Sequence, residues 1–147
     1  MKRIFTFVLI GLLWMLGESK AMASLQLASP ITVSKSDIAY KEAFSVSATV
    51  SNQGASDYTG QLGLALYDAG KQLVTVLSPQ YVVVNSGSDL SCQFHVDSWS
   101  ELMASQYHVS ICYMEGEWKQ VAAGGYNALE SLMIHADPCN GNVIYEC

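Results

Sequence analysis

The chain has 147 residues, of which 7 are basic and 13 acidic, so its formal net charge is −6 at pH 7. This acidic balance disfavours nucleic acids and anionic membrane surfaces, because binding to either depends on lysine and arginine. The length fits a single domain, and a hydrophobic fraction of 50% allows that domain to bury its own core.

The first 23 residues have the pattern of a secretory signal peptide. Lys2 and Arg3 give a positive start, residues 4–16 are apolar, and residues 21–23 form a small-x-small cleavage site. The apolar run is shorter than the roughly 17–25 residues that cross a bilayer, so an uncleaved anchor is the weaker alternative. We therefore expect a secreted or periplasmic protein whose mature chain starts at Ser24 and has no transmembrane segment.

Beyond the signal peptide, apolar and polar residues alternate with the period of two that is typical of half-buried strands. Turn-forming residues, as at 51–57 and 85–88, separate these segments. Only residues 97–104 resemble a helical turn, with Ser98 or Ser100 as its cap. The segments that we expect to form strands cover residues 44–50, 62–66, 72–77, 81–84, 90–96, 107–113, 118–121 and 129–135.

Short strands at intervals of roughly 8–12 residues, without long helices between them, favour an all-β fold over a parallel α/β fold. We expect an immunoglobulin-like antiparallel β-sandwich of about seven strands over residues 24–136, with a closed barrel as the alternative. Alternation along the strands places Val46, Leu64, Phe94 and Ile111 in the core. It leaves polar side chains on the opposite face of each strand.

Four cysteines follow the signal peptide, and export would permit disulfides in any of three pairings. Cys92 falls on the inward side of its strand and Cys112 on the outward side, so joining them would require a β-bulge. Cys139 and Cys147 lie in a tail at residues 137–147, beyond the last strand, and meet no such conflict. We therefore expect a Cys139–Cys147 disulfide and free thiols at Cys92 and Cys112.

Two segments at 50–54 and 58–68 are followed by a Tyr-x-Val-x-Ile-x-Tyr strand at 107–113 and a Gly-x-Trp turn at 116–118. Together they resemble exported bacterial immunoglobulin-like domains, and most nearly the accessory β-sandwich beyond the catalytic domain of streptopain-like cysteine peptidases. The resemblance implies a sandwich fold and an accessory role, because the catalytic residues of those peptidases belong to a separate domain without a counterpart here. Fold alone does not confer a function.

This resemblance covers residues 24–135 and rests on framework positions, among them a corner tyrosine. We expect Tyr107 to fill that position, with its hydroxyl bonded to the backbone near residues 99–104.

No residue pattern points to catalysis, so we expect a protein that is not an enzyme. His108 and Cys112 share a strand face, but four residues along a strand separate them by roughly 13 Å, too far for a nucleophile and its base. The chain has no Gly-x-Ser-x-Gly elbow. The histidines lack the spacing of a metal site, so we expect no cofactor. Turn aspartates such as Asp57 and Asp68 are expected to bond the backbone, with a calcium site as the alternative.

Aromatic residues near strand ends are the candidates for contact with a partner, because Trp and Tyr anchor interfaces. Each could instead cap the core. We expect an exported, non-catalytic binding or structural module that engages a protein or a carbohydrate through loops or a sheet edge. An inhibitor or chaperone of a secreted cysteine peptidase is the alternative, prompted by the family resemblance. The candidate residues are Tyr58, Tyr81, Trp99, Trp118 and Tyr126.

Overall fold

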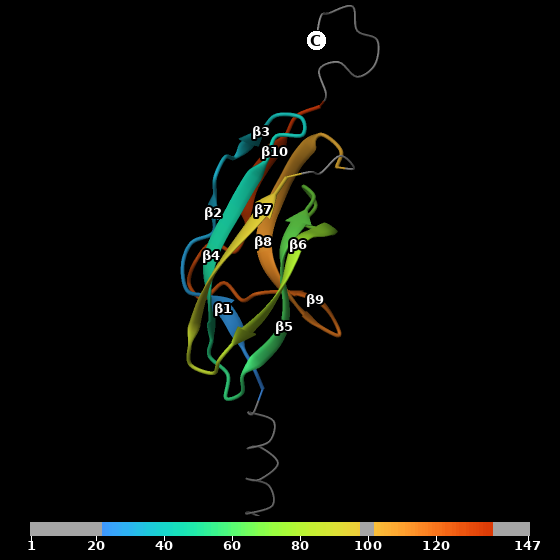
Figure 1. Cartoon of the computed structure of the whole chain (residues 1–147). Helices are drawn as coiled ribbons and strands as arrows, with labels where there is room; N and C mark the ends of the chain where they lie inside the picture. The colour runs from blue at the N-terminus through green and yellow to red at the C-terminus, as the bar shows by residue number, and fades with distance from the viewer. Residues whose placement is uncertain (1–21, 98–101, 137–147) are drawn as a thin grey trace, which may run out of the picture.

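Two β-sheets packed face to face form the computed structural model of the chain, which describes residues 22–97 and 102–136 (Figure 1). The described residues form ten strands and no helix. It follows that no helix among them is long and apolar enough to cross a membrane. The all-β sandwich that the sequence predicts is confirmed.

The four-stranded sheet is built around β4 (Phe44–Asn52). One edge of β4 pairs with β7 (Asp89–Val96) along most of its length. The other edge pairs with β1 (Leu25–Leu27) towards one end and with β2 (Thr32–Val33) towards the other. The central strand is therefore covered on both edges.

The six-stranded sheet has β5 (Tyr58–Tyr67) and β8 (Ser105–Glu115) at its centre. These two strands pair with each other. The other edge of β5 pairs with β6 (Leu73–Val84). The other edge of β8 pairs first with β10 (Glu130–Ile134) and then, further along, with β9 (Glu117–Gln120). At the outer edge, β3 (Asp37–Ile38) runs parallel to β10. All other strand pairs are antiparallel.

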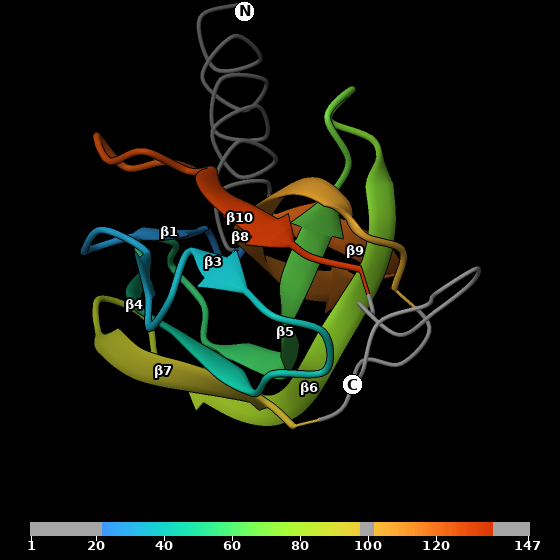
Figure 2. The same ribbon diagram turned by 90° about the horizontal axis from the view of Figure 1, so that it is seen from above.

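The connections between the sheets follow the immunoglobulin pattern. From β4 onward, the chain passes from one sheet to the other between β4 and β5, between β6 and β7, and between β7 and β8, as in a Greek key. Its first strands divide between the sheets, since β1 and β2 join β4 whereas β3 joins β10 (Figure 2). These three short strands have no periodic signal in the sequence, because two or three residues cannot show an alternation.

The core lies between the sheets and has the inward phase that the sequence predicts. Val46, Leu64, Phe94 and Ile111 come from four different strands, and each is 0% exposed. Alternation with exposed neighbours is regular along β7, where every second residue from 90 to 96 is turned inward. The predicted core positions are therefore confirmed.

Strand β6 is continuous, although the sequence predicts two separate strands at 72–77 and 81–84. The register shifts by one residue between the pairs Leu62–Gln80 and Leu64–Leu77, which places a β-bulge at Ser78. Ser78 has a φ of 49°, and Pro79 follows it. Pro lacks a backbone N–H and is tolerated at a bulge or on an edge strand, so its presence does not end β6.

The bulge turns β6 towards β7, so that the two edge strands close one side of the sandwich (Figure 2). Ser78 Oγ donates to the backbone oxygen of His95 at 2.7 Å, and Gln80 Nε2 donates to that of Gln93 at 2.5 Å. These side chains cover carbonyl groups that an exposed strand edge would offer to another chain.

The buried side chain of Asn52 fixes one end of the sandwich. Asn52 is 0% exposed, and its Nδ2 donates to the backbone oxygens of Ser56 and Val84, both at 2.9 Å. Its Oδ1 accepts from the backbone N–H groups of Gly54 at 2.9 Å and Ser24 at 3.1 Å. Asn52 thus ties the first strand, the β4–β5 loop and the end of β6 together.

Tyr107 takes the corner position that the sequence predicts. Its hydroxyl donates to the backbone oxygen of Met103 at 2.5 Å, and its ring is buried. The helical turn expected at 97–104 falls partly on 98–101, which lie outside the described residues. The neighbouring residues 102–104 form no helix.

Candidate functional site

Tyr58, the first of the predicted partner-contact residues, lies in the core and is 6% exposed. Its ring meets that of Tyr113 edge to face, with centroids 5.7 Å apart. Its hydroxyl donates to the backbone oxygens of Gln61 at 3.0 Å and Met114 at 2.8 Å. Burial raises the pKa of the phenol. Tyr58 therefore holds β5 and β8 together from the inside.

Tyr81 and Trp118 lie on the outer face of the six-stranded sheet, meaning the face turned away from the core. Tyr81 pairs with Gln61 and Trp118 pairs with Met114, while the bonds of Tyr58 keep Gln61 and Met114 adjacent. Residues directly opposite each other in a sheet share a face. We call Tyr81, Gln61, Met114 and Trp118 the aromatic row. It crosses β6, β5, β8 and β9 over about 14 Å, which is three strand spacings.

The end of the aromatic row on β6 is open to solvent. Tyr81 is 77% exposed, and Val83, which shares its face two residues further along β6, is 55% exposed. The side-chain amides of Gln61 and Gln120, which belong to the same face, make no hydrogen bond within the described residues. An aromatic ring, an aliphatic side chain and two unbonded amides are thus available together.

The centre of the outer face is buried, although the strand pattern predicts a polar surface there. Ala65 is 0% exposed, and Ser110 and Cys112 are each 1% exposed. Part of the cover comes from Trp118, whose indole reaches across β8 to Gly63 on β5, and from Val76 on β6, which lies against the same glycine. Side chains from strands outside the central pair thus keep solvent away from this face. The alternation of apolar and polar residues along β5 and β8 does not reveal this cover.

Both described cysteines are free thiols, and they face opposite ways as the sequence predicts. Cys92 belongs to the core, where its Sγ donates to the backbone oxygen of Ala48 at 3.2 Å, and burial raises its pKa to about 11. Cys112 lies under Trp118 on the other face. Burial raises the Cys112 pKa to about 12, and its Sγ donates to the Gly63 backbone oxygen at 3.4 Å.

The remaining predicted residues are placed as follows. Tyr126 lies in the loop between β9 and β10 and is 41% exposed. Trp99, Cys139 and Cys147 lie outside the described residues, so the Cys139–Cys147 disulfide stays a prediction.

A chain of three polar side chains on the four-stranded sheet has no counterpart in the sequence analysis. Ser45 Oγ lies 2.8 Å from His95 Nδ1, and His95 Nε2 lies 2.7 Å from Asp97 Oδ1. Strand register brings Ser45 and His95 together, since they are direct partners in the β4–β7 pair. The side chains of His95 and Asp97 are 56% and 81% exposed, so water competes for every bond in this chain.

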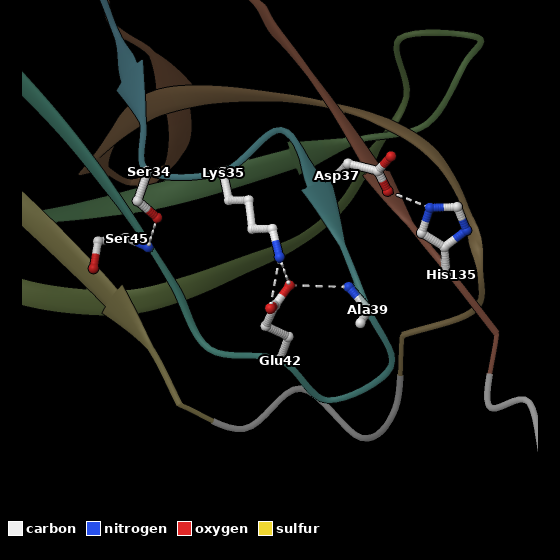
Figure 3. Close-up of polar contacts among 7 residues, drawn as sticks. All are labelled: Ser34, Lys35, Asp37, Ala39, Glu42, Ser45 and His135. Carbon is white, nitrogen blue, oxygen red and sulfur yellow. Dashed lines mark hydrogen bonds and ion pairs between the residues drawn. The ribbon is translucent and has the colours of Figure 1, made fainter. Parts of the chain in front are cut away.

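A second polar group ties β3 to its surroundings (Figure 3). Asp37 accepts a hydrogen bond from His135 Nε2 across the parallel β3–β10 pair. Lys35 Nζ lies 2.8 Å from Glu42 Oε2, and Ala39 N–H donates to Glu42 Oε1 at 3.1 Å. The Lys35 bond is the main cause of a lowered Glu42 pKa. These exposed contacts order the β3–β4 turn at the sheet edge.

Among the shallow hollows on the surface of the described residues are two with distinct linings. One, of about 280 Å³, lies where the chain between β1 and β2 leaves β4, and its lining includes the hydroxyl groups of Ser29, Ser47 and Thr49. The other, of about 380 Å³, lies beside the Tyr107 corner and is lined by Val74 and Met103 among others. Neither hollow contains any residue of the aromatic row.

Two of the turn aspartates, Asp57 and Asp68, bond the backbone as the sequence predicts. Asp57 Oδ1 accepts from Ser86 N–H at 2.8 Å, and Asp68 Oδ1 accepts from Gln72 N–H at 2.9 Å. Among residues 22–97 and 102–136, His, Cys, Asp and Glu side chains form no group of three that could hold a metal ion.

No protein-family model and no curated protein sequence matches the chain. Solved structures match it in fold. A Pseudomonas fluorescens alkylpurine DNA glycosylase bound to DNA matches with a TM-score of 0.54 and 10% identity, over 79% of this chain and 31% of its own. A Paenibacillus cycloisomaltooligosaccharide glucanotransferase matches with a TM-score of 0.51 and 18% identity, over 79% and 15%. A Listeria innocua β-glucosidase matches with 0.52 and 10%, over 78% and 16%.

The chain therefore spans less than a third of the length of each of these proteins. At such identities the likeness is one of fold, because sandwiches of this kind support many unrelated functions.

Proposed function

We propose that the protein is an exported, non-catalytic binding module that engages a partner protein or carbohydrate through the aromatic row. The observation that carries this proposal is the 77% exposure of Tyr81 beside the unbonded amide of Gln61, on a rigid sheet face. Tyrosine and tryptophan supply a large contact area at a low cost in side-chain entropy, which is why they anchor interfaces.

The polar groups elsewhere support a binding role better than a catalytic one. In the Ser45–His95–Asp97 chain the carboxylate of Asp97 is 81% exposed. Water therefore competes with the carboxylate for the imidazole, which is held only weakly in place. Efficient general-base catalysis depends on a base and a nucleophile held in a site that excludes water. The two buried thiols have raised pKa values, whereas nucleophilic cysteines need lowered ones.

The test is capture of a partner by the exported protein and by matched variants. The protein is immobilised and exposed to the exported proteins of its host and to a panel of polysaccharides. Tyr81→Ala removes the exposed ring with little effect on stability, and we expect it to abolish capture. Tyr126→Ala removes an exposed ring from the β9–β10 loop and should leave capture unchanged.

Equal capture by the native protein and by Tyr81→Ala would contradict this proposal, and so would a loss confined to Tyr126→Ala. The same samples can be added to a streptopain-like cysteine peptidase. Inhibition that depends on Tyr81 would identify the partner as a peptidase, while inhibition that is independent of Tyr81 would move the site away from the aromatic row.

A further inference from the structure

The aromatic row carries no charge, although the chain is acidic. Glu115, Glu117 and Lys119 lie close by on the β8–β9 hairpin, but they alternate with Met114 and Trp118 and so project from the other face. Two of them are also paired, with Lys119 Nζ 3.3 Å from Glu115 Oε1. An anionic ligand therefore finds no cation in the row, and a cationic ligand finds no carboxylate.

The groups that are present suit a ligand that is both hydroxylated and apolar. The face of an aromatic ring is the negative part of its quadrupole and attracts weakly positive C–H groups. Side-chain amides both donate and accept hydrogen bonds, and those of Gln61 and Gln120 make none within the described residues. A pyranose ring offers a C–H face and a rim of hydroxyl groups, which match the ring and the amides respectively.

The arrangement of the row suits an extended carbohydrate chain. Tyr81 stands on an edge strand and is 77% exposed, so a ligand can reach its ring without rearrangement of the protein. Gln61 lies beside Tyr81, and the Trp118 indole lies across β8 against Gly63. A chain of sugar rings laid across the strands would therefore contact the two rings and the amide in turn.

We infer that the aromatic row binds a neutral carbohydrate chain, stacked on Tyr81 and Trp118 and hydrogen-bonded by Gln61 and Gln120. This inference rests on the proposed binding function and specifies its ligand.

Affinity gel electrophoresis of the exported protein tests this inference. The probes are four neutral polysaccharides (hydroxyethylcellulose, xylan, laminarin and mannan) and two anionic ones (alginate and polygalacturonate). We expect retardation by at least one neutral probe and by neither anionic probe. Tyr81→Ala should weaken binding on the order of tenfold or more, as loss of an aromatic anchor does. Gln61→Ala should weaken it less, and Tyr126→Ala should not change it.

Trp118 also covers Cys112, so the conservative variant Trp118→Phe is used in place of alanine. It should retain part of the binding while its thermal transition stays cooperative. Retardation by no neutral probe would overturn the carbohydrate inference, as would binding that Tyr81→Ala leaves intact. Capture of a host protein that depends on Tyr81, without binding of any neutral probe, would overturn the inference but keep the proposed function. Failure of every Tyr81-dependent capture would overturn both.

Discussion

The indole of Trp118 on β9 lies against the backbone of Gly63 on β5, two strands away, although β9 itself pairs only with β8. A Cβ atom added at Gly63 would stand 3.4 Å from both Cη2 and Cζ3 of Trp118 and would overlap Cγ1 of Val76. The missing side chain therefore makes room for Val76 Cγ1, while the indole lies at ordinary contact distance from the same position. In turn, the indole attaches the short β8–β9 hairpin to the sheet and buries Cys112.

Gly63→Ala should destabilise the protein by about 1–3 kcal/mol, the usual cost of inserting a methyl group into a filled space. Denaturant unfolding followed by tryptophan fluorescence measures this cost and also reports displacement of Trp118. Gly70→Ala is the matched control, because its added Cβ would meet only Asp68 Oδ1 at an ordinary 3.4 Å. Equal stability of the two variants would mean that Val76 does not pack against Gly63 as the structure shows.

The outer face of β5 and β8 also marks where the sequence stops being informative. Alternation predicts correctly that Leu64 and Ile111 turn inward, because a strand with one buried face must repeat every two residues. It cannot reveal that Ala65 and Ser110, on the other face, are buried as well. Cover on that face comes from side chains of other strands, as Val76 and Trp118 show at Gly63, and alternation within one strand does not reveal them.

Strand register also brings polar groups together in ways that the sequence pattern does not reveal. Ser45 and His95 are direct partners in the β4–β7 pair, yet they lie far apart in the chain. Asn52 occurs in a segment that is rich in turn-forming residues, so composition predicts a loop position for it. In the structure it is the last residue of β4 and is fully buried.

Truncation of a core side chain should be costly at the positions that the sequence and the structure agree on. Phe94→Ala or Leu64→Ala should lower the free energy of unfolding by roughly 2–5 kcal/mol, because each leaves a cavity between the sheets. Val83→Ala, on the exposed face of β6, is the control and should change it by less than about 0.5 kcal/mol. A cost below that limit at Phe94 or Leu64 would mean that this side chain faces solvent and that the inward and outward sides of its strand have been assigned the wrong way round.

Asn52→Ala should lower stability by at least about 2 kcal/mol, since it removes a fully buried side chain that bonds the backbone of three segments. Among the lost bonds are those to the buried Val84 oxygen and to the part-buried Gly54 N–H. Urea titration measures the loss, and Asn85→Ala in the exposed turn after β6 is the control. A difference under about 0.5 kcal/mol between the two variants would contradict the buried network.

Processing of the chain should yield a mature protein that begins at Ser24. In the structure Ser24 N–H already donates to Asn52 Oδ1 at 3.1 Å, and its oxygen accepts from Gln53 N–H at 2.8 Å. Cleavage before Ser24 would leave an ammonium group that keeps the first of these bonds. Mass spectrometry of the exported protein identifies the N-terminus. A mature form that retains Lys2 and Arg3 would contradict the export assignment, and Ala23→Arg should block cleavage.

Thiol labelling tests the predicted Cys139–Cys147 disulfide together with the two buried cysteines. The native, non-reduced protein should react slowly, because Cys92 and Cys112 are buried. Unfolding without reductant should expose two thiols, and unfolding with reductant should expose all four cysteines of the sequence. Peptide mapping without reduction then locates the bridge. A peptide joining Cys92 or Cys112 to the tail, or to each other, would overturn both the pairing and the strand phase.

The same two thiols should make the protein sensitive to alkali. Burial raises the pKa of Cys92 to about 11 and that of Cys112 to about 12, above the value that either has in the unfolded chain. A raised folded-state pKa gives stability that is complete below the unfolded value of about 8.5 and is lost above it. Each thiol should then contribute a slope of up to about 1.4 kcal/mol per pH unit as the pH rises towards 11. Urea unfolding of the native protein and of Cys92→Ala between pH 8 and pH 10.5 measures this slope, with neutral pH as the reference. An identical slope in both proteins would mean that Cys92 is ionised as easily in the folded chain as in the unfolded one.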